Sequence, residues 1–87
     1  MYQSPFLNEI SRFMLARRYS KRTVETYVYW IITYIRFCGK QHPKALNGVD
    51  FERFLTHLAV NRTVSVSTQK VALNALVFLY NKFLNQP

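Results

Sequence analysis

Two short stretches of this chain combine basic, hydroxyl and amide side chains at spacings that suit a nucleic acid. The first stretch provides Arg17, Arg18, Ser20, Lys21, Arg22, Thr23 and Thr26. The second provides Ser67, Thr68, Gln69, Lys70 and Asn74. Cations, hydroxyls and the N–H groups that open a helix hold phosphate oxygens. Asparagine and glutamine can pair with adenine, and lysine can reach guanine. We therefore expect these residues to bind DNA through both phosphates and bases.

The charge of the chain is strongly positive and concentrated in one part. Twelve Lys and Arg face four Asp and Glu, which gives a net charge of +8 and a pI near 10.1. Residues 12–44 hold eight of these bases and a single acid, Glu25. This segment adds three further DNA-binding candidates, Arg36, Lys40 and Lys44. A basic half on a small domain is typical of proteins that bind a polyanion.

Other chemistry is poorly represented. A tetrahedral zinc site needs four nitrogen or sulfur ligands at paired spacings, and the chain offers only the scattered Cys38, His42 and His57. A catalytic nucleophile needs a nearby base and an orienting acid, and the chain has only four carboxylates. Its two glycines are isolated, so no phosphate-binding loop is present. We expect no catalytic residue, no metal, no cofactor and no small-molecule substrate.

Helical periodicity runs through the whole chain and divides it into four segments. The first three span about 5–18, 21–38 and 49–60, and serines at positions 4 and 20 can cap the first two. The fourth begins at Ser65 or Ser67 and runs to about Asn85. Four helices with short connections predict an all-α fold, a compact four-helix orthogonal bundle.

The second helical segment must contact more than one neighbour, because apolar side chains cover about half of its circumference. An aliphatic stripe lies beside an aromatic stripe, which consists of Thr23, Tyr27, Trp30, Tyr34 and Phe37. The opposite stripe is polar and basic at both ends, and consists of Arg22, Thr26, Tyr29, Thr33 and Arg36. We expect the aromatic stripe to be buried and the basic stripe to be exposed.

The length and composition allow one domain with one core. The chain has 87 residues and a mass of 10.4 kDa, and 49% of its residues are hydrophobic. A single cysteine cannot form an internal disulfide. No apolar run approaches the ~20 residues that span a bilayer, and the N-terminus lacks the basic-then-apolar order of a signal peptide. These features predict a cytoplasmic location and no membrane partner.

Two long runs of residues resemble one protein family. They are RRYSKRTVETYVYWIITYIRFCGKQHP and FLTHLAVNRTVSVSTQKVALNALVFLYNKFL, in matching order and spacing. The runs are similar to the N-terminal core-binding (SAM-like) domain of the tyrosine recombinases, and within that family most similar to the integron integrases. The resemblance covers residues 17–84, which is nearly the whole chain. It implies the SAM-like, phage-integrase N-terminal form of the four-helix bundle.

The resemblance also implies a function. A site-specific recombinase of this family clamps double-stranded attachment-site DNA during cassette integration and excision, and acts as a tetramer on DNA. Its N-terminal domain presents the starts of the second and fourth helices to the major groove. Its catalytic Arg, Lys, His, Arg and Tyr would lie after residue 87, so no tyrosine here would be the nucleophile. Residues 1–87 are thus expected to form a single DNA-binding domain that begins at the natural N-terminus, lacks the catalytic domain and is not itself an enzyme.

Two other functions stay open at this point. SAM-like helical folds also serve as protein–protein interaction adaptors, and a fold does not fix a function. A charge-mixed surface with an apolar patch would favour an adaptor. A basic amphipathic element on an anionic membrane would have to expose the aromatic stripe of residues 21–38, which would leave the bundle without a core. The clustered bases and hydroxyls favour DNA.

Overall fold

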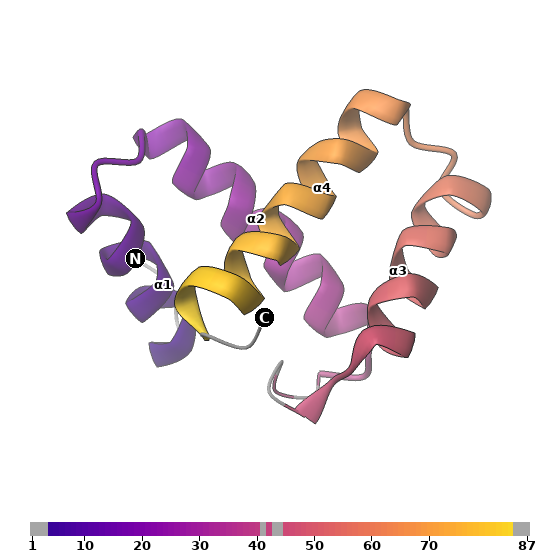
Figure 1. The fold of residues 1–87 in the computed structure, drawn as a ribbon, viewed down its shortest axis with the longest axis horizontal. Helices are drawn as coiled ribbons and strands as arrows, with labels where there is room; N and C mark the ends of the chain where they lie inside the picture. The colour runs from indigo at the N-terminus through magenta and orange to yellow at the C-terminus, as the bar shows by residue number, and fades with distance from the viewer. Residues whose placement is uncertain (1–3, 41, 43–44, 85–87) are drawn as a thin grey trace.

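The described part of the chain is entirely helical (Figure 1). A computed structural model describes residues 4–40, 42 and 45–84. Within them the elements are the α-helices α1 (Pro5–Ala16), α2 (Lys21–Phe37), α3 (Gly48–Val60) and α4 (Val66–Phe78), followed by the π-helical turn η2 (Leu79–Phe83). No strand occurs among these residues. The predicted all-α, four-helix fold is confirmed.

A polar side chain caps the start of each α-helix. Ser4, Ser20 and Ser65 each accept a hydrogen bond from the N–H group three residues later. Asn47 forms a capping box with Asp50, whose carboxylate accepts the Asn47 N–H at 3.0 Å. Such caps pair N–H groups that have no partner inside the helix. Of the two starts considered for the fourth helix, Ser65 is therefore the cap.

The end of the fourth helix differs from the prediction of one helix to about Asn85. The α-helical part stops at Phe78, residues Leu79–Phe83 form the π-helical turn, and Asn85 lies outside the described residues. A π turn rotates less per residue than an α turn, so side chains three positions apart point in more divergent directions. Tyr80 thereby reaches the hydroxyl of Tyr34 in α2, while Phe83 packs on the ring of Phe13 in α1.

Helix α2 packs on more than one neighbour, as predicted. On one side lies a core formed with α1 and the end of the fourth helix, consisting of Ile10, Met14, Val24, Val28, Ile31, Phe78 and Leu79. On the other side lies a core formed with α3 and α4, consisting of Trp30, Tyr34, Phe54, Leu58, Ala72, Ala75 and Leu76. In the aromatic stripe, Trp30 and Tyr34 are buried and Tyr27 and Phe37 are half-buried. Tyr29, in the opposite stripe, is 51% exposed.

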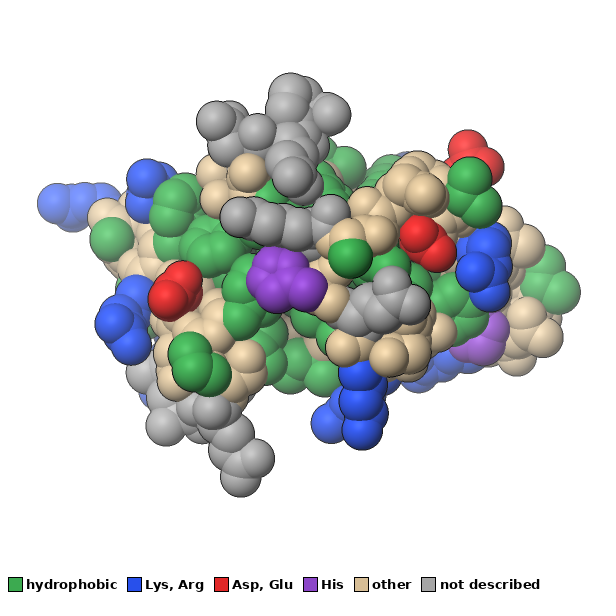
Figure 2. Space-filling view, turned by 90° about the horizontal axis from the view of Figure 1, so that it is seen from below, with side chains coloured by type: hydrophobic (Ala, Val, Ile, Leu, Met, Phe, Trp, Pro, Cys, Tyr) green, Lys and Arg blue, Asp and Glu red, His purple; other side chains and the backbone are tan. Residues whose placement is uncertain are grey.

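Helices α2 and α4 cross near the middle of the molecule, with α1 beside one half of α2 and α3 beside the other (Figure 1). The small side chains of Ala72 and Ala75 are fully buried, which allows a close approach at the crossing. Both α2 and α4 begin at the upper edge in Figure 1, whereas α1 and α3 begin at the lower edge. Figure 2 shows this lower edge, where hydrophobic side chains and a histidine lie in the middle and both acidic and basic side chains lie around them. The crossing therefore leaves the starts of the two predicted DNA-facing helices on the same edge of the molecule, α2 at its left and α4 at its right (Figure 1).

Candidate nucleic-acid interface

The start of α2 is built from a serine, a threonine and two cations. The Thr23 N–H donates to the Oγ of Ser20 at 3.1 Å, and the Ser20 hydroxyl donates to the Oγ1 of Thr23 at 2.9 Å. Lys21 and Arg22 are the first two helical residues, and both are exposed. An acidic residue usually complements the positive end of a helix dipole, but the first turn of α2 has none. The two cations are unfavourable there for the helix itself, and an anion would offset that penalty.

The start of α4 repeats the serine–threonine cap but not the pair of cations, because its first turn consists of Val66, Ser67 and Thr68. The Thr68 N–H donates to the Oγ of Ser65 at 3.1 Å, and the two hydroxyls lie 3.0 Å apart. The first turn of α4 also lacks an acid, as does that of α1, whereas α3 has Asp50 there. Ser67 and Lys70 follow on the exposed side. Two helix starts with the same serine–threonine cap, both without an acid, therefore lie on the same edge of the molecule (Figure 1).

A shallow hollow joins the two helices just below these starts. It is lined by Arg22, Thr23, Thr26, Tyr27, Val71 and Asn74. Four of these belong to the predicted set, and they come from both of the stretches that the sequence singled out. The hollow contains one charged group, the guanidinium of Arg22, and one amide, that of Asn74. Cation, hydroxyl and amide thus meet on one surface.

The remaining candidates on α4 face elsewhere. Gln69 is half-buried and lies with Lys70 beside Leu55, in a separate hollow between α3 and α4. Thr68 is half-buried as the partner of the Ser65 cap. The structure therefore places Asn74, rather than Gln69, next to the α2 residues.

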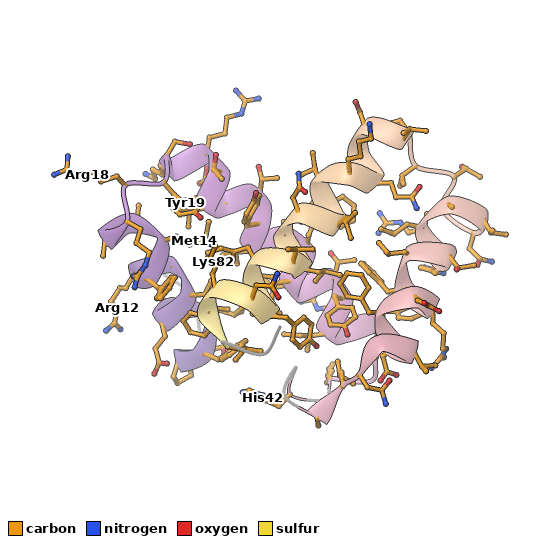
Figure 3. All side chains as sticks on the ribbon, viewed as in Figure 1. Arg12, Met14, Arg18, Tyr19, His42 and Lys82 are labelled. Atoms are coloured by element: carbon orange, nitrogen blue, oxygen red, sulfur yellow. The ribbon has the colours of Figure 1, made fainter. Side chains whose placement is uncertain are left out.

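The two arginines between α1 and α2 have different surroundings. Arg17 donates from Nη1 to the Phe13 carbonyl at 3.3 Å, and its guanidinium lies 3.4 Å from the centre of the Phe13 ring. Arg17 therefore stabilises the end of α1. Arg18 is exposed, and Figure 3 shows it projecting away from the α1–α2 turn, while Tyr19 points inward. The backbone of Arg18 is left-handed, with φ of 65°.

The other basic candidates lie far from the hollow. Arg36 is fourteen residues beyond Arg22 on α2, or about 21 Å along its axis. Lys40 follows the end of α2 and is also exposed. Lys44 lies outside the described residues. Sequence periodicity correctly placed Arg22 and Arg36 on one exposed face, but it could not gather them at one point.

Sequence reasoning missed Val71 and Tyr27 as parts of this surface. Val71 is 36% exposed, although it is apolar, and it lies one helical turn before Asn74. Its position on the narrow polar face of the fourth helix was the available signal. Tyr27 is half-buried and packs its ring on Phe78, with ring centres 5.7 Å apart.

The titratable groups of the core are not arranged for catalysis. Burial raises the pKa of Tyr34 far above its usual range, and the hydrogen bond to Tyr80 raises it further. Burial also raises the pKa of Tyr80 and of the Cys38 thiol. These groups are therefore held in their protonated forms, whereas a nucleophile needs a lowered pKa or an adjacent base.

The histidines have aromatic neighbours. The ring centre of His42 lies 4.7 Å from that of Phe6, and the ring centre of His57 lies 4.8 Å from that of Phe37. Across residues 4–40, 42 and 45–84, no three His, Cys, Asp or Glu residues come together as a metal site. The helices in this part of the chain are also too short or too polar to cross a membrane.

Comparison with known proteins gives one consistent result. The chain matches the family described as phage integrase, N-terminal SAM-like domain, over residues 6–87. It is 50% identical over 66 residues to a protein named integrase/recombinase from Escherichia coli, and equally similar to one of the same name from Pseudomonas aeruginosa. Each alignment covers 76% of this chain and 20% of the relative. The chain thus spans about a fifth of the length of the curated relatives it matches.

Proposed function

Because the chain belongs to the phage integrase N-terminal SAM-like domain family, we propose that it is the DNA-binding domain of a site-specific tyrosine recombinase of the integron integrase type. In this role it holds double-stranded attachment-site DNA while cassettes are integrated or excised. The partner domain that cleaves DNA belongs to the rest of the recombinase polypeptide, which acts in the cytoplasm as a tetramer on DNA. Residues 4–84 supply binding and no cleavage.

One observation carries this proposal. The crossing of α2 and α4 places two helix starts without acids on one edge of the molecule, and between the two helices lies a hollow lined by Arg22, Thr26 and Asn74. The major groove of B-DNA is about 12 Å wide and admits a helix, and its walls are phosphates. Lys21 and Arg22 at the α2 start would face one of those walls, and the hollow would face the base edges beside it.

Individual roles follow from exposure and position. Arg18, Lys21 and Arg22 are exposed cations next to the α2 start, so we assign them to phosphates. Asn74 is exposed and lines the hollow between the two helices, and we assign it to a base edge. The hydroxyls of Ser20 and Thr23 are occupied with each other, so they contribute chiefly by ordering the N–H groups of α2.

Titration of the chain with duplex DNA over a range of salt tests the proposal. Contacts with four to six phosphates give a log–log salt slope of about −4 to −5, on a non-specific dissociation constant of roughly 10⁻⁴–10⁻⁶ M at physiological salt. A nicking assay in parallel should show no cleavage. Salt-independent binding would favour a protein-interaction adaptor, and a covalent protein–DNA adduct would refute the assignment of catalysis to another domain.

A matched pair of variants locates the surface. Lys21→Ala removes a cation at the α2 start, and should weaken binding to all sequences and flatten the salt slope by about one unit. Lys82→Ala removes an exposed cation from η2, at the other end of the fourth helix (Figure 3), and should change neither. Equal effects of the two substitutions would mean that net charge alone, and no particular surface, drives binding.

A further inference from the structure

The hollow between α2 and α4 is chemically divided in a way that phosphate binding does not require. Arg22 and the hydroxyl of Thr26 suit a phosphate. Val71 and the half-buried ring of Tyr27 are apolar, and Val71 is 36% exposed. An exposed valine cannot form a hydrogen bond or an ion pair with a phosphate. A surface for phosphates alone would gain from a polar residue at position 71. An apolar side chain beside an exposed amide instead suits a base edge.

The amide of Asn74 provides one donor and one acceptor side by side. Adenine presents the complementary pair in the major groove, an N7 acceptor and an N6 donor. Guanine presents two acceptors there, N7 and O6, which match the paired donors of an arginine or lysine and would leave the Asn74 carbonyl without a partner. The amide therefore favours adenine.

Val71 distinguishes thymine, the partner of adenine, from cytosine, the partner of guanine. Thymine carries the C5 methyl group, the one apolar group that projects into the major groove, whereas cytosine presents an amino donor. Val71 would bury the methyl group, but it would remove water from a cytosine amino group without replacing the hydrogen bond. Val71 and Asn74 are three positions apart on α4, so their side chains are neighbours on the helix surface, about 5–6 Å apart at Cβ.

We infer that the hollow selects an A·T base pair, with the Asn74 amide on the adenine edge and Val71 against the thymine methyl group. This inference rests on the proposed DNA-binding function and adds a specific preference to it. The residues that supply the preference are Asn74 and Val71, while Arg22 anchors the neighbouring phosphate.

Selection from a library tests this assignment. The 87-residue chain is incubated at low salt with duplexes that carry a randomised centre, and bound and unbound duplexes are sequenced. We expect an A·T pair at one position to be enriched roughly five- to a hundredfold over G·C, as one bidentate base contact provides. Asn74→Ala should abolish this preference. Asn81→Ala, which removes a second exposed asparagine from a different hollow beside Leu46 and Phe51, should preserve it.

A modified base isolates the methyl contact. Replacing thymine by deoxyuridine at the selected position removes one methyl group, and should weaken binding of the unmodified chain about fourfold. Val71→Ala should be insensitive to that replacement, whereas Val77→Ala, whose valine is 42% exposed outside the hollow, should remain sensitive.

These experiments distinguish failure of the A·T selection from failure of the DNA-binding function. Salt-dependent binding with no A·T preference, or with the same preference in Asn74→Ala, would overturn the selection of an A·T pair and leave the DNA-binding function standing. Enrichment of G·C would also overturn the selection of an A·T pair. So would a loss of affinity on deoxyuridine replacement that is as large in Val71→Ala as in the unmodified chain. Absence of salt-dependent binding to any library member would overturn both.

Discussion

The hydroxyl groups of Tyr34 and Tyr80 lie 3.2 Å apart and join α2 to the π-helical turn that follows α4. Tyr34 is fully buried and Tyr80 is half-buried, and their rings meet edge to face with centres 6.4 Å apart. This contact lies at the end of the α2–α4 pair that is remote from the helix starts. The hydrogen bond holds α2 against the end of the fourth helix, so its loss should change the distance between the two helices at the hollow.

The tyrosine pair predicts a loss of stability at alkaline pH. Burial raises the pKa of both phenols in the folded state above their usual value of 10.0, while the unfolded chain releases these protons near pH 10. The contribution of this pair to stability should therefore be constant below about pH 10 and fall above it, by up to about 1.4 kcal/mol per pH unit for each proton retained.

Urea denaturation between pH 8 and 11.5, monitored by circular dichroism, measures this slope. Tyr34→Phe removes the more deeply buried hydroxyl and should make the alkaline decline shallower. Burial also raises the pKa of the Cys38 thiol above its usual value of 9.0, so Cys38 should contribute to the loss of stability from about pH 9 upward. Cys38→Ala measures this separate contribution. An identical decline in Tyr34→Phe would show that the tyrosine pair does not set it.

Two neighbouring aromatic residues on α2 should differ sharply in their contribution to stability. Trp30 is 6% exposed in the core between α2, α3 and α4, so Trp30→Ala should cost about 3–5 kcal/mol. Tyr29 is 51% exposed, so Tyr29→Ala should change stability by about 0.5 kcal/mol or less. Thermal melts of the two variants compare them directly. A melting temperature for Trp30→Ala near that of the unmodified chain would contradict the burial of the aromatic stripe.

Local features of the fold were predictable from the sequence because local interactions determine them. The caps at Ser20 and Ser65 depend on a hydroxyl and an N–H three residues later, and the contrast between Trp30 and Tyr29 depends on helical periodicity. All of these are contained within one helical segment.

Two features could not be predicted because they depend on how helices pack together. Gln69 and Asn74 are five positions apart, or about 140° around the helix, and only the crossing with α2 decides which of them faces the hollow. The π-helical turn at Leu79–Phe83 forms where Tyr80 and Phe83 contact different helices, which periodicity along one segment does not reveal.

Arg18 should lower the stability of the domain, because its backbone adopts the left-handed conformation. It occupies the position after the α1 cap where glycine is usual, with its N–H bonded to the Leu15 carbonyl at 3.0 Å and the next N–H bonded to Met14 at 3.1 Å. Its φ of 65° is unfavourable for a residue with a side chain. Arg18→Gly should therefore stabilise the domain by about 0.5–1 kcal/mol, and lower DNA affinity by removing one phosphate contact.

Thermal melts and salt titrations of the same protein samples measure both effects. Arg18→Asn removes the same charge and also tolerates the left-handed conformation, so it should weaken DNA binding to the same extent as Arg18→Gly. A glycine variant that is more stable and binds as tightly as the unmodified chain would exclude Arg18 from the DNA contacts. A less stable variant would mean that the turn gains more from the arginine side chain than it loses in backbone conformation.

Substitution of the α2 cap should separate folding from binding. Aspartate caps a helix as well as serine does, so Ser20→Asp should leave stability within about 0.5 kcal/mol, whereas Ser20→Ala should lose about 1 kcal/mol. The carboxylate of the aspartate variant would lie beside the N–H group of Thr23 and next to Lys21, where we place a phosphate. DNA affinity should consequently fall at least tenfold, because a fixed negative charge repels the phosphate.

Ser4→Asp is the matched control. It adds the same charge at the α1 cap, which lies at the opposite edge of the molecule (Figure 1), and should lower affinity much less. Equal losses of affinity in the two aspartate variants, measured at matched stability, would remove the α2 start from the binding surface.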